Sequence, residues 1–373
     1  MDAKLLLEGT EHQPRARAAL GAALSSGPSH AYLFHGPRGA GKRAVARSFA
    51  AEILAVEAED PYDARRRALL DPSPHPDLVW LAPRGAQHMV EEVRERVIRA
   101  ASYRPFEGQR RVFVIEAAEA MREESQNALL KTLEEPPAYA YLILLTAEPE
   151  SLLETVASRC QPIDFAPFPT PALEAALRRE QGPAAAAEEL VAAARLSAGD
   201  LDRARLLLSE RGREIRAEAE RLAGAAIGGE TATAPWKQLL DSAQAAGEEA
   251  EAGTREALAE EASAGLKRPA REISEEAKRS ARRRRTEILD LGLELTAAWL
   301  RDLVAVAAGA PEVIYNRDRL TQLRSQAASL SPAAARQAAE LVQDTRRRLD
   351  LNVSEELALE ALAYRLEATS SNG

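Results

Sequence analysis

Between residues 111 and 160 the chain reads RVFVIE (111–116), SQNALLKTLE (125–134), YLILLT (141–146) and SRC (158–160). The first and third segments are short apolar runs, and the second has the spacing of a helix of about three turns, stopped by two consecutive prolines. Two buried strands joined by a helix predict a βαβ unit in a parallel sheet. Glu116 and Thr146 end these strands, where open α/β sheets bind their ligands.

A phosphate-loop pattern lies upstream of this unit. The apolar run 31–35 predicts a strand that leads directly into the sequence GPRGAGKR (36–43), after which a helix begins. In this strand–loop–helix context, G-x-x-x-x-G-K predicts a loop whose backbone amides converge on phosphate oxygens, while the helix amino terminus and Lys42 add positive charge. The expected phosphate-binding residues are Gly36, Pro37, Gly39, Ala40, Gly41 and Lys42.

The residues around this loop argue against ATP hydrolysis. A working phosphate loop places Ser or Thr after the lysine to bind Mg²⁺, but Arg43 has only donor groups. Motor ATPases follow the metal-binding carboxylate with a glutamate that activates water, whereas Glu116 is followed by Ala117, and Glu119 comes too late in the sequence. We expect Glu116 and Glu119 to be ordinary solvated residues. ATP binding, if retained, is expected to be weak, and no cofactor is required.

Composition excludes several classes of protein. The chain has 373 residues, enough for two or three domains, and a net charge of −9, so any contact with nucleic acid must be local. Cys160 is the only cysteine, which excludes an intrachain disulfide and a cysteine-built zinc site. His75 and His88 are interpreted as solvated loop residues, and no metal site is predicted. Because no apolar run approaches ~20 residues and no signal peptide is evident, we expect a cytoplasmic protein without membrane contact.

Three segments together resemble the bacterial clamp-loader AAA+ subunits. They are HAYLFHGP (30–37), QNALLKTLEEPP (126–137) and SRC (158–160). The degraded ATP site is most similar to that of the delta-prime class of DNA polymerase III. The resemblance covers residues 10–165, although the four-cysteine zinc module that many members carry is missing between residues 49 and 78.

The resemblance implies a fold, partners and site residues. The expected fold is an α/β AAA+ P-loop domain with a parallel sheet flanked by helices, a small helical lid and an all-α collar. The implied partners, in a hetero-oligomer, are the tau/gamma motor and delta subunits, the sliding clamp and, through the complex, primer–template DNA. Arg159 would reach the ATP site of a neighbouring subunit as an arginine finger, with a salt bridge to a carboxylate such as Glu154 as the alternative. Arg203 is the candidate for the lid arginine that contacts nucleotide, although a solvated helix arginine fits it equally well.

Composition shifts predict the domain boundaries. We expect the AAA+ domain at 1–168, the lid at 169–210 and the collar at 211–373. The strongly charged region near 247–285 is expected to be an exposed insertion rather than core. Its basic end, Arg282–Arg285, is interpreted as the solvated start of a helix, with phosphate binding as the alternative.

These patterns predict a delta-prime-type subunit of the DNA polymerase III clamp loader. It would hydrolyse little or no ATP, act as a rigid stator and supply Arg159 in trans during loading of the sliding clamp on primed DNA. An active motor subunit of the same machine is the first alternative, and Arg43 and Ala117 speak against it. A P-loop kinase or transferase is the second, and we find neither the metal-binding hydroxyl nor the acceptor-site base it would need.

Overall fold

The computed structural model describes residues 10–83, 87–182, 186–263, 269–327, 331–349 and 353–371. It divides into two compact units, one formed by Met1–Pro169 with Gly199–Leu201, the other by Thr170–Ala198 with Asp202–Gly373. The division of the second unit into a lid and a collar stays a prediction.

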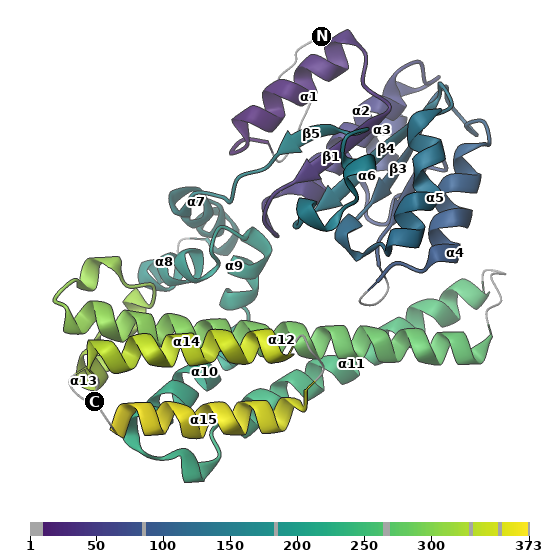
Figure 1. Cartoon of the computed structure of the whole chain (residues 1–373). Coiled ribbons are helices and arrows are strands. Elements are labelled where there is room, and N and C mark those ends of the chain that lie inside the picture. Colours follow the sequence, from purple (N-terminus) through teal and green to yellow (C-terminus); the bar gives the residue numbers. More distant parts are fainter. Residues whose placement is uncertain are drawn as a thin grey trace. The chain divides into compact units, whose positions relative to one another are not determined.

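The first unit is built on a five-stranded parallel sheet (Figure 1). Its strands are β1 (Ala31–His35), β2 (Leu78–Leu81), β3 (Arg111–Ile115), β4 (Ala140–Thr146) and β5 (Gln161–Asp164), in the order β2-β3-β4-β1-β5. β3 and β4 are neighbours, with Val112 opposite Tyr141, so the predicted βαβ unit is confirmed. The order places β1, which feeds the phosphate loop, between β4 and β5. This is the predicted α/β AAA+ fold.

Helices cover both faces of the sheet, as Figure 1 shows. One face, with Tyr32 and Phe34 of β1, packs against α1 (Pro14–Ser26), α2 (Lys42–Ala55) and α3 (Pro61–Leu69). The other, with Leu33, packs against α4 (Val90–Val93), the π-helical η1 (Arg94–Arg99), α5 (Glu123–Glu134) and α6 (Glu154–Ala157). Because successive side chains of a strand point to opposite faces, strands buried on both sides are apolar at nearly every position.

Helix α3 lies in a polar segment that contains several prolines. Asp60 caps it, because its side chain accepts hydrogen bonds from the backbone amides of Tyr62 and Asp63, both at 3.0 Å. Pro61 occupies the first helical position, where a missing N–H costs nothing. An aspartate followed by proline therefore starts a helix here.

The described part of the second unit is helical. It begins with the expected short helices α7 (Thr170–Gln181), α8 (Ala187–Leu196) and α9 (Leu201–Leu208), the last of which starts in the first unit. Six further helices of the described residues follow, shown from teal to yellow in Figure 1: α10 (Glu210–Gly228), α11 (Trp236–Ser263), α12 (Ala270–Ala307), α13 (Leu320–Ala327), α14 (Pro332–Leu349) and α15 (Glu355–Ser371). All of them except the short α13 are longer than α7, α8 and α9. No helix among the described residues is long and apolar enough to span a membrane.

The charged region 247–285 is not the exposed insertion that we expected. Its described residues are helical, belonging to α11 and α12, which pack along each other. A side chain at Gly247 would overlap Arg285 of α12, and both Leu258 and Ala277 are buried. Small residues let two helices approach closely, so this packing needs few large apolar side chains. Residues 264–268 of the predicted insertion lie outside the described residues.

Carboxylates neutralise much of the basic end of that region. Arg283 and Arg284 both pair with Glu287 in the next turn of α12, while Arg285 pairs with Glu355 at the start of α15. These contacts favour the interpretation of a helix face over a phosphate site.

Candidate functional site

The phosphate loop has the predicted strand–loop–helix setting, since β1 ends at His35 and α2 begins at Lys42. Gly36 has a φ of 140° and Gly39 a φ of 65°, conformations that L side chains rarely adopt. Gly36 also lies against the backbone carbonyl of Phe165, where a side chain would overlap it. The sequence therefore needs glycine at both positions to form the loop.

Lys42 is turned back onto its own loop. Its Nζ donates to the Gly36 carbonyl and, at 2.7 Å, to the Pro37 carbonyl, and the residue is only 9% exposed. Burial lowers the pKa of Lys42 to about 8, against the opposing attraction of the Glu119 and Asp200 carboxylates. The lysine is thus held by the carbonyls of its own loop.

Arg43 occupies the place of the magnesium-binding hydroxyl and pairs with carboxylates. Its Nη2 donates to Asp71 Oδ2 at 2.9 Å, and its Nε lies 3.7 Å from Glu116 Oε2. The guanidinium also lies 5.7 Å from the ring centroid of Trp80. A fixed positive charge therefore stands beside the carboxylate that ends β3, where a motor ATPase holds its metal.

The expectation that Glu116 and Glu119 are ordinary solvated residues is wrong. Glu116 is partly buried, and its Oε2 accepts a hydrogen bond of 2.9 Å from Trp80 Nε1. Oε2 of Glu119 is buried without a hydrogen-bond partner, near enough to Lys42 to influence its pKa. Thr146 is buried at the end of β4, where its hydroxyl accepts from the backbone amide of Glu148 at 3.0 Å.

The two histidines interpreted as solvated are also buried. Nε2 of His88 lies 2.8 Å from the backbone carbonyl of Glu116, and His75 Nδ1 accepts from the amide of Asp77 at 3.2 Å. Burial lowers the pKa of both rings, which favours the neutral form at pH 7. Over the described ranges, no group of three or more His, Cys, Asp and Glu side chains is placed to hold a metal ion.

Arg159 follows α6 and differs from Arg43 in its partners. Its side chain is 36% exposed, donating through Nη1 to the Thr155 carbonyl at 2.8 Å and through Nη2 to Glu134 Oε1 at 2.6 Å. The salt-bridge partner is thus Glu134, at the end of α5, rather than the Glu154 that the sequence suggested. The adjacent Cys160 is buried, which raises its pKa to about 12 and leaves the thiol unreactive.

Arg203, the candidate lid arginine, belongs to the second unit. Its guanidinium pairs with Glu294 of α12, within the same unit. Nucleotide contact by Arg203 stays a prediction.

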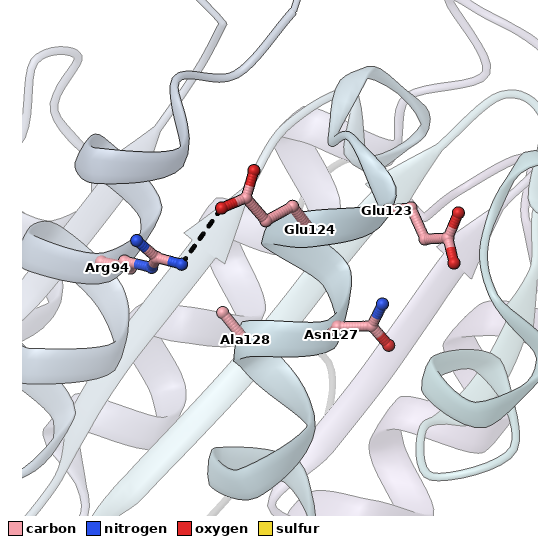
Figure 2. Close-up of a pocket in the computed structure, with 5 residues that line it drawn as sticks. All are labelled: Arg94, Glu123, Glu124, Asn127 and Ala128. Carbon is pink, nitrogen blue, oxygen red and sulfur yellow. Dashed lines mark hydrogen bonds and ion pairs between the residues drawn. The ribbon is translucent and has the colours of Figure 1, made fainter.

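A surface groove of about 710 Å³ lies on the first unit between η1 and α5 (Figure 2). Arg94, Glu123, Glu124, Asn127 and Ala128 line it, and Arg94 forms an ion pair of 3.3 Å with Glu124. None of the predicted site residues lines this groove.

Several residues that shape the site have no recognisable signal in the sequence. Asp71 and Trp80 hold Arg43 and Glu116, and nothing in their spacing links them to the loop. Gln13 is buried before α1, and its Nε2 donates to the carbonyls of Ala40 and Ala166 at 3.0 and 2.6 Å. It ties the loop to the chain that leaves β5.

The strand order and the loop define an AAA+ phosphate-loop domain whose metal-binding position holds an arginine. The family described as "DNA polymerase III, delta subunit" matches residues 12–169. The DNA polymerase III subunit delta' of Pseudomonas aeruginosa is 38% identical over 202 residues, 51% of this chain and 59% of that protein. A tau/gamma subunit from Haemophilus influenzae is 36% identical over 134 residues, 35% of this chain and 19% of that one.

Among solved structures, a gamma subunit-related protein from Thermotoga maritima covers 95% of this chain and 99% of its own, with 15% identity and a TM-score of 0.43. Over residues 12–169, this chain is similar to the DNA polymerase III clamp-loader subunits of the delta-prime type. It spans little more than half the length of its delta-prime relative from Pseudomonas.

Proposed function

We propose that this protein is a non-hydrolysing stator of a DNA polymerase III clamp loader, which supplies Arg159 to the ATP site of a neighbouring subunit. The observation that carries this proposal is the presence of Arg43 at the position of the magnesium-binding hydroxyl. Nearly all catalysis of phosphoryl transfer comes from positioning and from stabilising charge around Mg²⁺. An arginine at the metal-ligand position, paired with Asp71 and near Glu116, supports loss of that chemistry.

The immediate surroundings of Glu116 support the same conclusion. Trp80 and Arg43 engage Glu116 Oε2, which leaves that oxygen poorly placed to bind a metal ion. Ala117, in a left-handed conformation with a φ of 51°, follows where motor ATPases place their general base. A nucleotide is therefore not required for this subunit's role, and any ATP binding would be weak.

Arg159 supports the second half of the proposal by its accessibility. Its contact with Glu134 is an exposed ion pair, a type worth ~0–1 kcal/mol, so a neighbouring anion would meet little resistance. An arginine offers the planar fork of donors that phosphate oxygens favour. A finger of this kind contributes ~10³–10⁵ in rate in well-studied GTPases.

The proposed partners follow from the relatives. They are the tau/gamma motor and delta subunits, the sliding clamp, and primer–template DNA through the assembled complex. Reconstitution tests this: the chain should co-purify with tau/gamma and delta subunits, and omitting it should abolish clamp loading. Loading at the full rate without the chain, or failure to co-purify, would contradict the proposal.

The relationship to tau/gamma subunits keeps an active motor as the second candidate. ATP hydrolysis by the isolated chain would favour the motor. We find no observation that favours a kinase or transferase.

A further inference from the structure

A three-residue segment of the helical region returns to the phosphate loop. Gly199–Leu201 belong to the first unit, although the residues on both sides of them belong to the second. The Gly199 carbonyl accepts a hydrogen bond of 3.0 Å from the Phe168 amide. A side chain at Gly199 would overlap Pro167, so glycine permits this close approach.

This segment brings the carboxylate of Asp200 against the phosphate loop. The Asp200 carboxylate occupies the space that a side chain at Gly39 would need. A Cβ atom at residue 39 would overlap the carboxylate carbon and both of its oxygens. Asp200 is also near enough to Lys42 to raise its pKa, against the effect of burial. An anion from the protein itself therefore lies beside the loop's glycine and within electrostatic range of its lysine.

A phosphate loop attracts anions through its amides, the helix terminus and its lysine. Two anions at one such site repel each other, and the repulsion grows as the local dielectric constant falls. The carboxylate of Asp200 is negatively charged, like the phosphate groups that such a loop attracts. Lys42, meanwhile, donates to the loop's own carbonyls.

We propose that Asp200 is an internal anion that closes the phosphate loop and excludes the phosphates of a nucleoside diphosphate or triphosphate. The inference rests on the proposed function, because it assumes that this loop does not have to hydrolyse ATP. It assigns to one residue the weak nucleotide affinity that the proposed function expects of this site. The phosphate loop itself would then remain able to bind phosphate once the carboxylate is removed.

Titration of the full chain with a fluorescent ADP in the absence of Mg²⁺ tests this inference. Asp200→Asn keeps the shape of the side chain and removes its charge, and it should bind ADP at least about tenfold more tightly than the wild type. Adding Lys42→Ala to Asp200→Asn should remove the gain, which would place the bound nucleotide at this loop. Asp202→Asn is the matched control and should leave affinity unchanged, because the Asp202 side chain is 84% exposed and pairs with Arg205 at 3.0 Å.

Equal affinity of Asp200→Asn and the wild type would overturn the inference, as would micromolar binding of ADP by the wild type. If circular dichroism shows that Asp200→Asn is unfolded, Asp200→Ser makes the same comparison with a smaller side chain. Hydrolysis of ATP is measured separately on the same proteins with Mg²⁺ present. Tighter binding by Asp200→Asn without turnover supports both the inference and the stator function. Equal affinity without turnover contradicts the inference alone, whereas turnover by the wild type contradicts the stator function and, because turnover needs bound nucleotide, the inference with it.

Discussion

The arginine beside the phosphate loop and the arginine after α6 carry the same charge in opposite circumstances. Arg43 is engaged from several sides, by Asp71, Glu116 and the ring of Trp80. Arg159 has one carboxylate partner, Glu134, and a backbone carbonyl one turn away. The first arginine is shared among several partners of its own domain, whereas the second has a single exposed ion pair that an outside anion could replace at little cost.

On the proposed function, this difference means that a phosphate-loop fold and the use of a nucleotide are separable. The loop keeps its glycines, its lysine and its place after β1, while the charges around it are balanced within the protein. The exposed guanidinium of Arg159 is the group that this domain can present to a neighbouring subunit. The predictions below test that contrast.

The largest expected effect concerns Arg159. In the reconstituted clamp loader, Arg159→Ala should lower ATP turnover at the neighbouring site by ~10³–10⁵, the range of arginine fingers in GTPases. The loss reflects missing stabilisation of charge on the transferring phosphoryl group. Arg159→Lys should restore little, because a point charge does not reproduce the planar fork. The measurement is DNA-stimulated ATP turnover, alongside a check that the complex assembles.

Arg94→Ala is the matched control for that experiment. Arg94 is also an exposed arginine of the first unit, with an ion pair of 3.3 Å to Glu124. Its removal should leave turnover unchanged. If Arg159→Ala assembles and loads clamps at the wild-type rate, Arg159 is a structural residue and the contrast with Arg43 disappears.

A smaller effect is expected from the pH dependence of Lys42. Its pKa is about 8 in the folded chain against an ordinary 10.5, so between these pH values the unfolded chain holds more protons and stability rises with pH. Below pH 8 the folded state bears the full cost of the buried charge. Relative to Lys42→Met, the wild type should gain on the order of 2–4 kcal/mol between about pH 7.5 and 10.5.

Urea unfolding at the two pH values measures this gain. Lys131→Met is the control, since Lys131 is exposed on α5. A pH-independent difference between wild type and Lys42→Met would show that the ammonium is not buried in the folded loop.

The smallest effect is expected for Arg43→Thr. The variant restores a magnesium-binding hydroxyl but leaves Ala117 in place of the general base, so we expect no turnover. Thermal unfolding should show a stability change of at most ~1 kcal/mol, because the Arg43 side chain is 55% exposed and such pairs contribute little. Appreciable ATPase activity in this variant would mean that a single substitution separates stator from motor.

The fold was largely predictable because its signals are local. Apolar runs bounded by turns place the strands, and the spacing of 125–134 places α5. The positions of the loop glycines and Lys42 follow from the same pattern. The cap of α3 at Asp60-Pro61 was equally local, and we missed it because the surrounding prolines suggested a loop.

The candidate site was less predictable because its partners are distant in sequence. Glu134 lies 25 residues from Arg159, and Asp71 lies 28 residues from Arg43. Burial of His88 and the approach of Asp200 to Gly39 likewise depend on tertiary packing, which no spacing encodes. The packing of α11 on α12 was missed because small residues gave too weak an apolar pattern.

ATP turnover by the purified chain alone, with Mg²⁺ and primed DNA present, tests the central claim most directly. Because Arg43 stands at the metal-ligand position and Ala117 at the position of the base, the wild type should hydrolyse no more ATP than Lys42→Ala. Turnover of about 1 s⁻¹ or faster, within the usual range of enzymes, that Lys42→Ala abolishes would contradict the stator assignment and identify this chain as a motor.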